Sequence, residues 1–127
     1  MKSKINKKEI SNYLYIIMII IVFLLSVNLS AQSFLNTEIS IVEFNSNWNK
    51  SNHFTGLDKI KNCKIYTVSI CDNPSYKDKF NIKIPTIVLY HNGKEVKRYK
   101  TNILFTFDIK YKNLQNDIDS ILLTKFN

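Results

Sequence analysis

The stretch IKIPTIVLYHNG, residues 82–93, carries the clearest structural signal in this chain of 127 residues. Residues 86–90 form an apolar run that predicts a β-strand. Asn92-Gly93 follows, and this pair between two strand patterns is the strongest short signal for a β-hairpin. Residues 95–99 alternate in polarity and predict the returning strand. The stretch therefore predicts two antiparallel strands joined by a tight turn.

Two more strands are predicted upstream of this hairpin. Residues 38–44 and 64–70 are rich in β-branched and aromatic side chains, which favour sheets. Between them, Ser51-Asn52-His53 can cap a short helix that Gly56 weakens. Its apolar face would carry three residues spaced three apart, namely Phe54, Leu57 and Ile60.

The remaining elements complete an α/β pattern. Residues 72–75 predict a turn into a short helical segment that ends near Phe80. The tail from residue 107 places aliphatic residues on one helical stripe, namely Ile109, Leu114, Ile118, Ile121 and Leu122. The order is β-α-β-(turn)-β-β-α, in which the first strand pair is parallel and the hairpin adds antiparallel strands. We predict a four-stranded mixed sheet packed by helices.

Residues 1–31 have the pattern of a targeting segment. Four lysines form a basic start, residues 13–25 are an unbroken apolar run, and Ser30-Ala31 supplies the small residues of a possible cleavage site. We expect a cleaved signal peptide, with an uncleaved membrane anchor formed by residues 13–29 as the alternative. Residues 32–127 then form one domain, and both interpretations take it out of the cytosol as a secreted, periplasmic or lumenal protein.

The basic charge of the chain does not indicate a nucleic-acid site. The net charge is +8, of which the four lysines and Glu9 of the leader supply +3. The remaining cations are spread singly, without an arginine cluster or interleaved aromatic residues. We therefore expect a solvated basic surface and no nucleic-acid partner.

Three local patterns, taken with the order of elements, resemble the thioredoxin-like superfamily over residues 38–125. IVEFNSNW, residues 41–48, looks like the family's strand leading into its active-site tryptophan. Asp72-Asn73-Pro74 is similar to the turn after the central strand, and residues 82–93 resemble the Ile-Pro-Thr strand and Asn-Gly hairpin. No extra strand and helix precede Ile39, so the resemblance implies the minimal version of this fold.

The resemblance also implies a site, and the chain departs from the family there. Asn49 and Asn52, after Trp48, stand where the family has its nucleophilic and resolving cysteines. Glu43 falls at the position of a buried carboxylate, and Pro85 at that of a proline with a cis peptide bond. An asparagine amide is not a nucleophile, so the dithiol reaction cannot run at residues 49 and 52.

The family's substrate groove needs no thiol. In the family, the backbone before the cis-proline pairs with an extended substrate segment, which is a form of β-strand addition. The corresponding peptide group here is that of Ile84, flanked by Trp48 and followed by Pro85-Thr86. Trp48 could equally serve packing or contact.

Two cysteines remain, at the ends of the second predicted strand. Their Cα atoms would lie about 26 Å apart at roughly 3.3 Å per residue, beyond the limit of about 7 Å for a disulfide. We expect Cys71 to be a small buried hydrophobe. Cys63, between Lys61 and Lys64, has the better chance of exposure and of a lowered pKa.

The sequence indicates no cofactor or metal site. The two histidines, His53 and His91, lack partners at matched spacing, so surface or capping roles are expected. Our first hypothesis is an exported, redox-inactive thioredoxin-like protein that binds a peptide or protein partner. Alternatives are a thiol-disulfide exchange protein that uses Cys63 or Cys71, and a structural assembly subunit.

Overall fold

The computed structural model describes residues 6–126, with side chains for residues 6–22 and 33–126. The chain divides into two compact units, Met1–Ser33 and Phe34–Asn127. The second unit holds all four strands, β1 (Ile39–Asn45), β2 (Lys64–Ser69), β3 (Thr86–His91) and β4 (Lys94–Lys100). Each strand lies within one residue of its predicted bounds.

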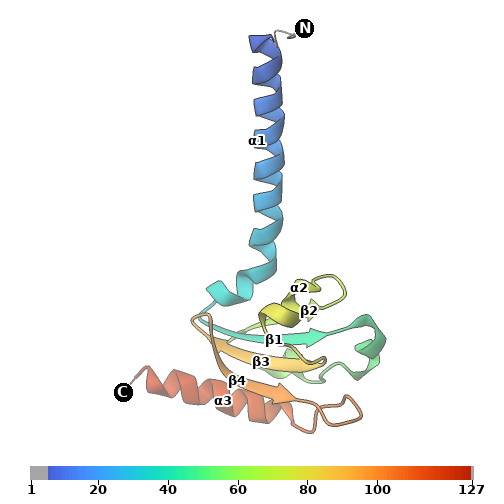
Figure 1. Ribbon diagram of the computed structural model, residues 1–127. Helices are drawn as coiled ribbons and strands as arrows, with labels where there is room; N and C mark the ends of the chain where they lie inside the picture. Colours follow the sequence, from blue (N-terminus) through green and yellow to red (C-terminus); the bar gives the residue numbers. More distant parts are fainter. Residues whose placement is uncertain (1–5, 127) are drawn as a thin grey trace. The chain divides into compact units, whose positions relative to one another are not determined.

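The four strands form one mixed sheet in the order β2-β1-β3-β4 (Figure 1). β1 pairs with β2 in parallel and with β3 antiparallel, and β3 pairs with β4 antiparallel. The predicted fold class, a minimal α/β fold with a four-stranded mixed sheet, is therefore confirmed. The central strands β1 and β3 are almost completely buried, as their apolar sequences require.

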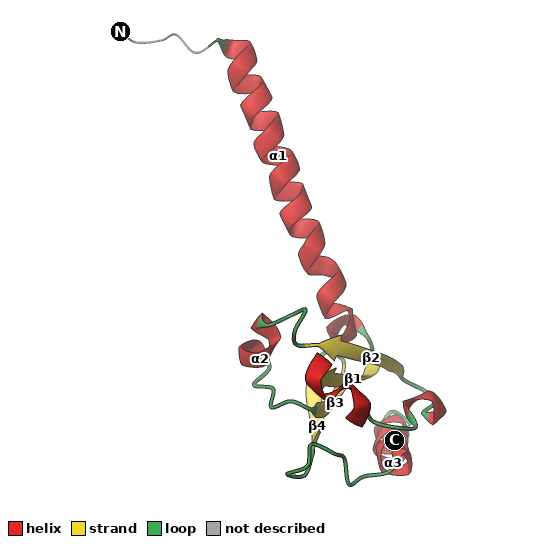
Figure 2. Cartoon of the chain, turned by 90° about the vertical axis from the view of Figure 1, so that its right-hand side faces the viewer, coloured by secondary structure: helices red, strands yellow, loops and turns green. Residues whose placement is uncertain are grey.

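The two faces of the sheet are covered by different elements (Figure 2). Helix α3 (Tyr111–Thr124) packs on one face through Leu114 and Ile118. The short helix α2 (Ser75–Lys79) lies on the other face, where its buried Tyr76 joins an aromatic cluster around Phe34. Alternate residues of each strand point to opposite faces, so β1 contributes to both cores.

The hairpin between β3 and β4 turns at Asn92-Gly93, as predicted. Both residues have positive φ angles, 50° and 76°, which is the requirement of the two-residue turn that joins right-twisted strands. Gly93 is also needed for space, because a Cβ atom there would lie 2.6 Å from the carbonyl oxygen of Leu35.

The helix predicted after Trp48 is wrong. The chain instead makes two short 3₁₀ helices, Asn47–Asn52 and Leu57–Lys59. His53 is extended (φ −59°, ψ 147°) and Gly56 is left-handed (φ 95°), and neither conformation continues an α-helix. Phe54, Leu57 and Ile60 nevertheless reach the core that their spacing predicted. The tail helix also begins later than expected, at Tyr111.

The first unit consists mainly of helix α1 (Lys7–Leu29), followed by a 3₁₀ segment, Ser30–Asn36, that leads into the second unit. Its apolar side chains from Ile10 to Val22 are exposed. No helix in the described part of the chain is both long and apolar enough to cross a membrane. Lys2, Lys4 and the side chains around the expected cleavage site at Ala31 lie outside the described residues.

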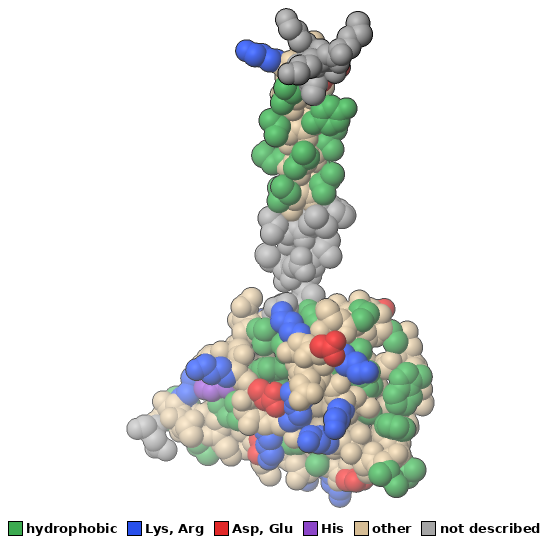
Figure 3. Space-filling model, in the orientation of Figure 1, with side chains coloured by type: hydrophobic (Ala, Val, Ile, Leu, Met, Phe, Trp, Pro, Cys, Tyr) green, Lys and Arg blue, Asp and Glu red, His purple; other side chains and the backbone are tan. Residues whose placement is uncertain are grey.

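The surface of the folded unit carries charges of both signs (Figure 3). On the face shown in Figure 3, basic side chains are scattered and acidic ones lie among them.

Candidate functional site

Four connecting segments meet at one end of the sheet. Asn45 at the end of β1 pairs with Ser69 at the end of β2, and its neighbour Phe44 pairs with Thr86 at the start of β3. Thr86 in turn pairs with Lys100 at the end of β4. The segments 46–52, 70–74, 83–85 and 101–106 therefore emerge at the same end. The sheet brings together all the predicted site residues except Glu43 and Cys63, which lie farther from this end.

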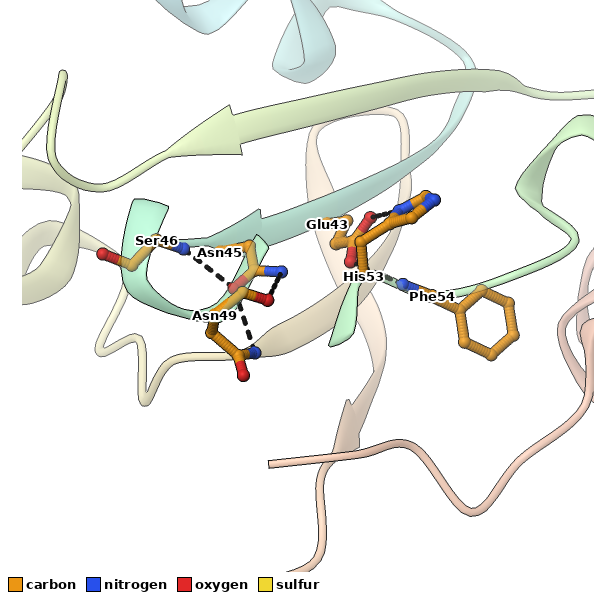
Figure 4. Close-up of polar contacts among 6 residues, drawn as sticks. All are labelled: Glu43, Asn45, Ser46, Asn49, His53 and Phe54. Carbon is orange, nitrogen blue, oxygen red and sulfur yellow. Dashed lines mark hydrogen bonds and ion pairs between the residues drawn. The ribbon is translucent and has the colours of Figure 1, made fainter. Parts of the chain in front are cut away.

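The two asparagines at the cysteine positions are part of one hydrogen-bond chain. Asn49 is buried, and its side-chain amide donates to Oδ1 of Asn45 at 3.2 Å (Figure 4). Asn52 donates to Oδ1 of Asn49 at 2.9 Å. The same Asn45 oxygen accepts the backbone N–H of Ser46 at 2.8 Å. These amides hold the turn after β1 in place, and none of them can form a disulfide.

The Glu43 carboxylate is completely buried and has two hydrogen-bond partners (Figure 4). Oε1 accepts the backbone N–H of Phe54 at 2.9 Å, and Oε2 lies 3.1 Å from Nδ1 of His53. Sequence analysis offered no reason to pair His53 with Glu43, because nine residues separate them and a helix was expected to start there. The extended backbone at His53 is what brings both the His53 ring and the Phe54 N–H to the carboxylate.

A hollow of about 490 Å³ opens beside this pair. It lies between the end of β1, the edge strand β2 and the 3₁₀ turn, and all but one of the residues that line it have polar side chains. Lys50 and Asp72 supply its charged side chains, and the His53 ring also lines it. The described residues contain no group of three or more His, Cys, Asp or Glu side chains that could hold a metal ion.

The segment before β3 has the shape that the resemblance implied. The Ile84–Pro85 peptide bond is cis. Pro85 and Thr86 are buried, whereas Ile84 is half-buried. The Thr86 hydroxyl donates a hydrogen bond to the Lys83 carbonyl oxygen, which fixes the turn into the strand.

Trp48 is exposed and belongs to an apolar cluster. Its side chain is 60% exposed, and its ring meets that of Phe105 edge to face at a centroid distance of 5.1 Å. Ile103 and Leu104, the neighbours of Phe105, are 93% and 70% exposed. We call Trp48, Ile103, Leu104 and Phe105 the apolar cluster. Of the two roles considered for Trp48, its exposure favours contact over core packing.

Asn102 fixes the loop that carries most of this cluster. Its Oδ1 accepts the backbone N–H groups of Leu104 (2.8 Å) and Thr106 (3.2 Å). Its Nδ2 donates to Thr106 Oγ1 and to Asp108 Oδ1. Phe105 adopts a left-handed φ of 59°, which is rare for a bulky residue. The sequence analysis missed this loop, although three consecutive large apolar residues between a strand and a helix were a visible signal.

The two cysteines have the reverse of the expected environments. Cys71 is exposed, because β2 ends at Ser69 and Ile70 takes the buried position. Hydrogen bonds from the Ser46 hydroxyl, with Oγ 3.0 Å from the sulfur, and from the Asn47 backbone lower the pKa of Cys71. Cys63 packs against the core beside α3, and this burial raises its pKa to about 11.

Comparisons with known proteins concern the fold. No protein-family model and no curated protein sequence matches the chain. Thioredoxin-2 of the malaria parasite, described as a component of its protein secretion machinery, superposes with a TM-score of 0.53 at 22% identity, over 66% of this chain and 84% of that one. The chain has a thioredoxin-like fold.

Two further solved structures share this fold. A designed protein superposes with a TM-score of 0.53 at 19% identity, over 72% of this chain and 83% of its own. Human ERp44 superposes with a TM-score of 0.51 at 18% identity, over 70% of this chain but only 29% of its own length. At these identities the likeness establishes the fold alone.

Proposed function

We propose that this chain is an exported thioredoxin-like protein that binds an extended segment of a partner protein at the end of the sheet bearing Trp48. Binding there needs no dithiol, and we propose that none operates. The partner would pair with the backbone of Ile84 and place an apolar side chain on the apolar cluster.

The observation that carries this proposal is the exposure of the apolar cluster. Burying a large apolar side chain stabilises a protein by about 1.5–3 kcal/mol. The four side chains of the cluster are exposed, so each contributes only part of this stabilisation in the free protein. Contiguous exposed apolar patches are typical of interaction sites. Aromatic residues, Trp above all, are enriched among the residues that dominate binding energies.

The fixed loop supports the same conclusion. Asn102 holds the backbone of residues 104–106 through two accepted hydrogen bonds. A partner that docks on an ordered loop does not have to supply the free energy of ordering it. The loop therefore holds Ile103, Leu104 and Phe105 ready for contact.

The asparagines support the absence of dithiol chemistry. Asn49 and Asn52 hydrogen-bond to each other at the positions where the thiols would stand. Proton transfer by the buried carboxylate would have no thiol to serve there. Glu43 instead accepts the N–H of Phe54 and lies within hydrogen-bond distance of the His53 ring, which suits a structural role.

Partner capture by site variants tests the proposal. The double variant Trp48→Ala, Ile84→Asp should capture at least tenfold less partner than the wild type, because it removes the aromatic anchor and places a charge at the pairing backbone. Val96→Asp is the matched control, since Val96 is also exposed (51%) but lies on β4 toward the hairpin end of the sheet. Unchanged capture by the double variant, with its fold verified by circular dichroism, would refute the proposal.

The exposure of Cys71 favours one second candidate, a thiol-disulfide exchange activity. An accessible thiol with a lowered pKa has the properties of an attacking nucleophile. Turnover of an insulin-type disulfide substrate that is lost in Cys71→Ser and kept in Cys63→Ser would establish this activity in place of simple binding. Absence of turnover in the wild type would leave the binding proposal as the better account.

A further inference from the structure

Strand β2 forms an edge of the sheet that has little protection against pairing. Its register with β1 runs without interruption from Ser40 opposite Lys64 to Asn45 opposite Ser69, and no described strand pairs with its other side. The strand contains no proline, and none of its side chains is buried. Unpaired strand edges are templates for pairing with another chain, which proteins usually block with charges, prolines or bulges.

The opposite edge is protected in this way, which makes the contrast informative. Five of the seven residues of β4, KEVKRYK, are charged, whereas β2, KIYTVS, has one charged residue among six. β4 also carries a register shift near Leu89 and Tyr90 of β3. The edge formed by β4 is therefore protected against pairing with another strand, and the edge formed by β2 is not.

The hydrogen bonds between β1 and β2 identify the open backbone groups. Ile70 donates its backbone N–H to the carbonyl of Asn45, so the even-numbered residues near the end of β2 face β1. In a strand, the N–H and C=O groups of one residue point to the same side, and those of the next residue point to the opposite side. Ile65 and Thr67 therefore direct their N–H and C=O groups away from the sheet.

We propose that this edge pairs antiparallel with β2 of a second copy of the chain, centred on Tyr66. In that register Ile65 of each copy lies opposite Thr67 of the other, as a hydrogen-bonded pair. The outward groups of the two residues in both copies then form four backbone hydrogen bonds. The two sheets join into one continuous sheet of eight strands related by a two-fold axis, the commonest symmetry of protein dimers.

The side chains of β2 fit this self-pairing better than pairing with an unspecified segment. The two Tyr66 residues face each other at the axis, where aromatic pairs stabilise antiparallel strands. The Tyr66 ring is already positioned by its contact with Phe34 and by a hydrogen bond of 2.9 Å to the Thr37 hydroxyl. Each Lys64 meets Val68 of the other copy, so the two lysines lie at opposite ends of the ladder and do not repel each other.

Disulfide trapping in the full chain tests the register. In a Cys63→Ala, Cys71→Ser background, Tyr66→Cys should give a covalent dimer under mild oxidation, because the Cα atoms of such a facing pair lie about 4.5 Å apart. Lys64→Cys is the control: the two residues 64 would be four positions out of register, roughly 13 Å along the strands, which exceeds the range of a disulfide. Non-reducing gels of cells that express each variant show whether the covalent dimer forms with Tyr66→Cys and with Lys64→Cys.

A second pair of variants covers the case in which the loss of Tyr66 weakens the fold. Ile65→Cys and Thr67→Cys, both at exposed positions, should cross-link efficiently only when the two differently tagged chains are made together. When Thr67→Pro is added to the Ile65→Cys chain, that chain loses its outward N–H at residue 67, at an edge position where a strand tolerates proline. Its cross-link to the Thr67→Cys chain should then fall sharply. Equal cross-linking of Lys64→Cys and Tyr66→Cys, no cross-link at any position, or cross-links only to a different protein would each overturn the proposal.

Discussion

The buried carboxylate of Glu43 shows how single residues determine this site. Removing an ionised carboxylate from water is costly unless hydrogen bonds replace its solvation. The N–H of Phe54 and the ring of His53 supply two such bonds from consecutive residues. The carboxylate thus fixes the path of the chain just after the asparagine turn, where a helix was expected.

Replacing this carboxylate should destabilise the fold. In Glu43→Leu, the buried backbone N–H of Phe54 loses its acceptor, at a cost of about 1–3 kcal/mol. Urea unfolding measures the change. Asp58→Asn, at an exposed carboxylate, should change the free energy of unfolding by less than about 0.5 kcal/mol. Equal effects in the two variants would contradict a structural role for Glu43.

The two thiols should differ in their reactivity with an alkylating agent. The thiolate is the reactive form, and the pKa of Cys71 is lowered by Ser46 whereas that of Cys63 is raised to about 11 by burial. As the pH rises, alkylation of Cys71 should therefore set in first, with Cys63 protected in the folded protein. Mass spectrometry of timed samples measures both rates.

Ser46→Ala provides the control for this difference. It removes the hydroxyl that contributes most to the lowered pKa, so the alkylation profile of Cys71 should move to higher pH while that of Cys63 stays in place. A profile of Cys71 that does not move would show that the Ser46 hydroxyl does not stabilise the thiolate.

At the scale of elements, two tight turns each require a glycine. Both Gly56 and Gly93 have left-handed φ angles, which cost an L-residue roughly 1–2 kcal/mol. Only at Gly93 would a Cβ atom also meet backbone, the carbonyl oxygen of Leu35 at 2.6 Å. At Gly56 the nearest atom is the Tyr111 Cβ at 3.1 Å.

Gly93→Ala should therefore destabilise the protein more than Gly56→Ala. We expect a loss of about 1–2 kcal/mol at Gly56, from the backbone conformation, and a larger loss at Gly93, where the clash adds to it. Chemical denaturation of the two variants side by side gives the comparison. A larger loss at Gly56 would mean that the hairpin moves away from Leu35 at little cost.

Elements differed in how far the sequence could predict them. Residues 82–93 specify strand, turn and strand through local chemistry alone, and the structure follows them within one residue. The segment 51–60 carries a helical spacing of apolar residues but not a helix, because Gly56 and the buried Glu43 impose other conformations. Local spacing predicted which side chains are buried there, and tertiary contacts decided the backbone.

The same distinction holds for the candidate site. Trp48, Asn49, Asn52 and Pro85 could be placed from the sequence, because the strand order brings their segments to one end of the sheet. The environments of Cys63 and Cys71 could not, because they depend on where β2 ends and on how α3 packs.

At the scale of the whole molecule, a leader followed by one domain stays a prediction from the sequence. The boundary lies after Ser33, two residues beyond the expected domain start at Gln32. If residues 1–31 are removed, the intact mass of the native protein should correspond to a chain that starts at Gln32. A mass that includes Met1 or the complete apolar run would instead favour an anchored protein.

The apolar cluster is an exposed apolar patch on the second unit, and Trp48, the chain's single tryptophan, reports on it directly. The account predicts that the fluorescence of Trp48 in the full chain shifts to shorter wavelength, and becomes less accessible to acrylamide, when a partner captured by the wild type is added back. An emission spectrum and an acrylamide quenching constant that stay unchanged, while the partner is bound, would contradict the account.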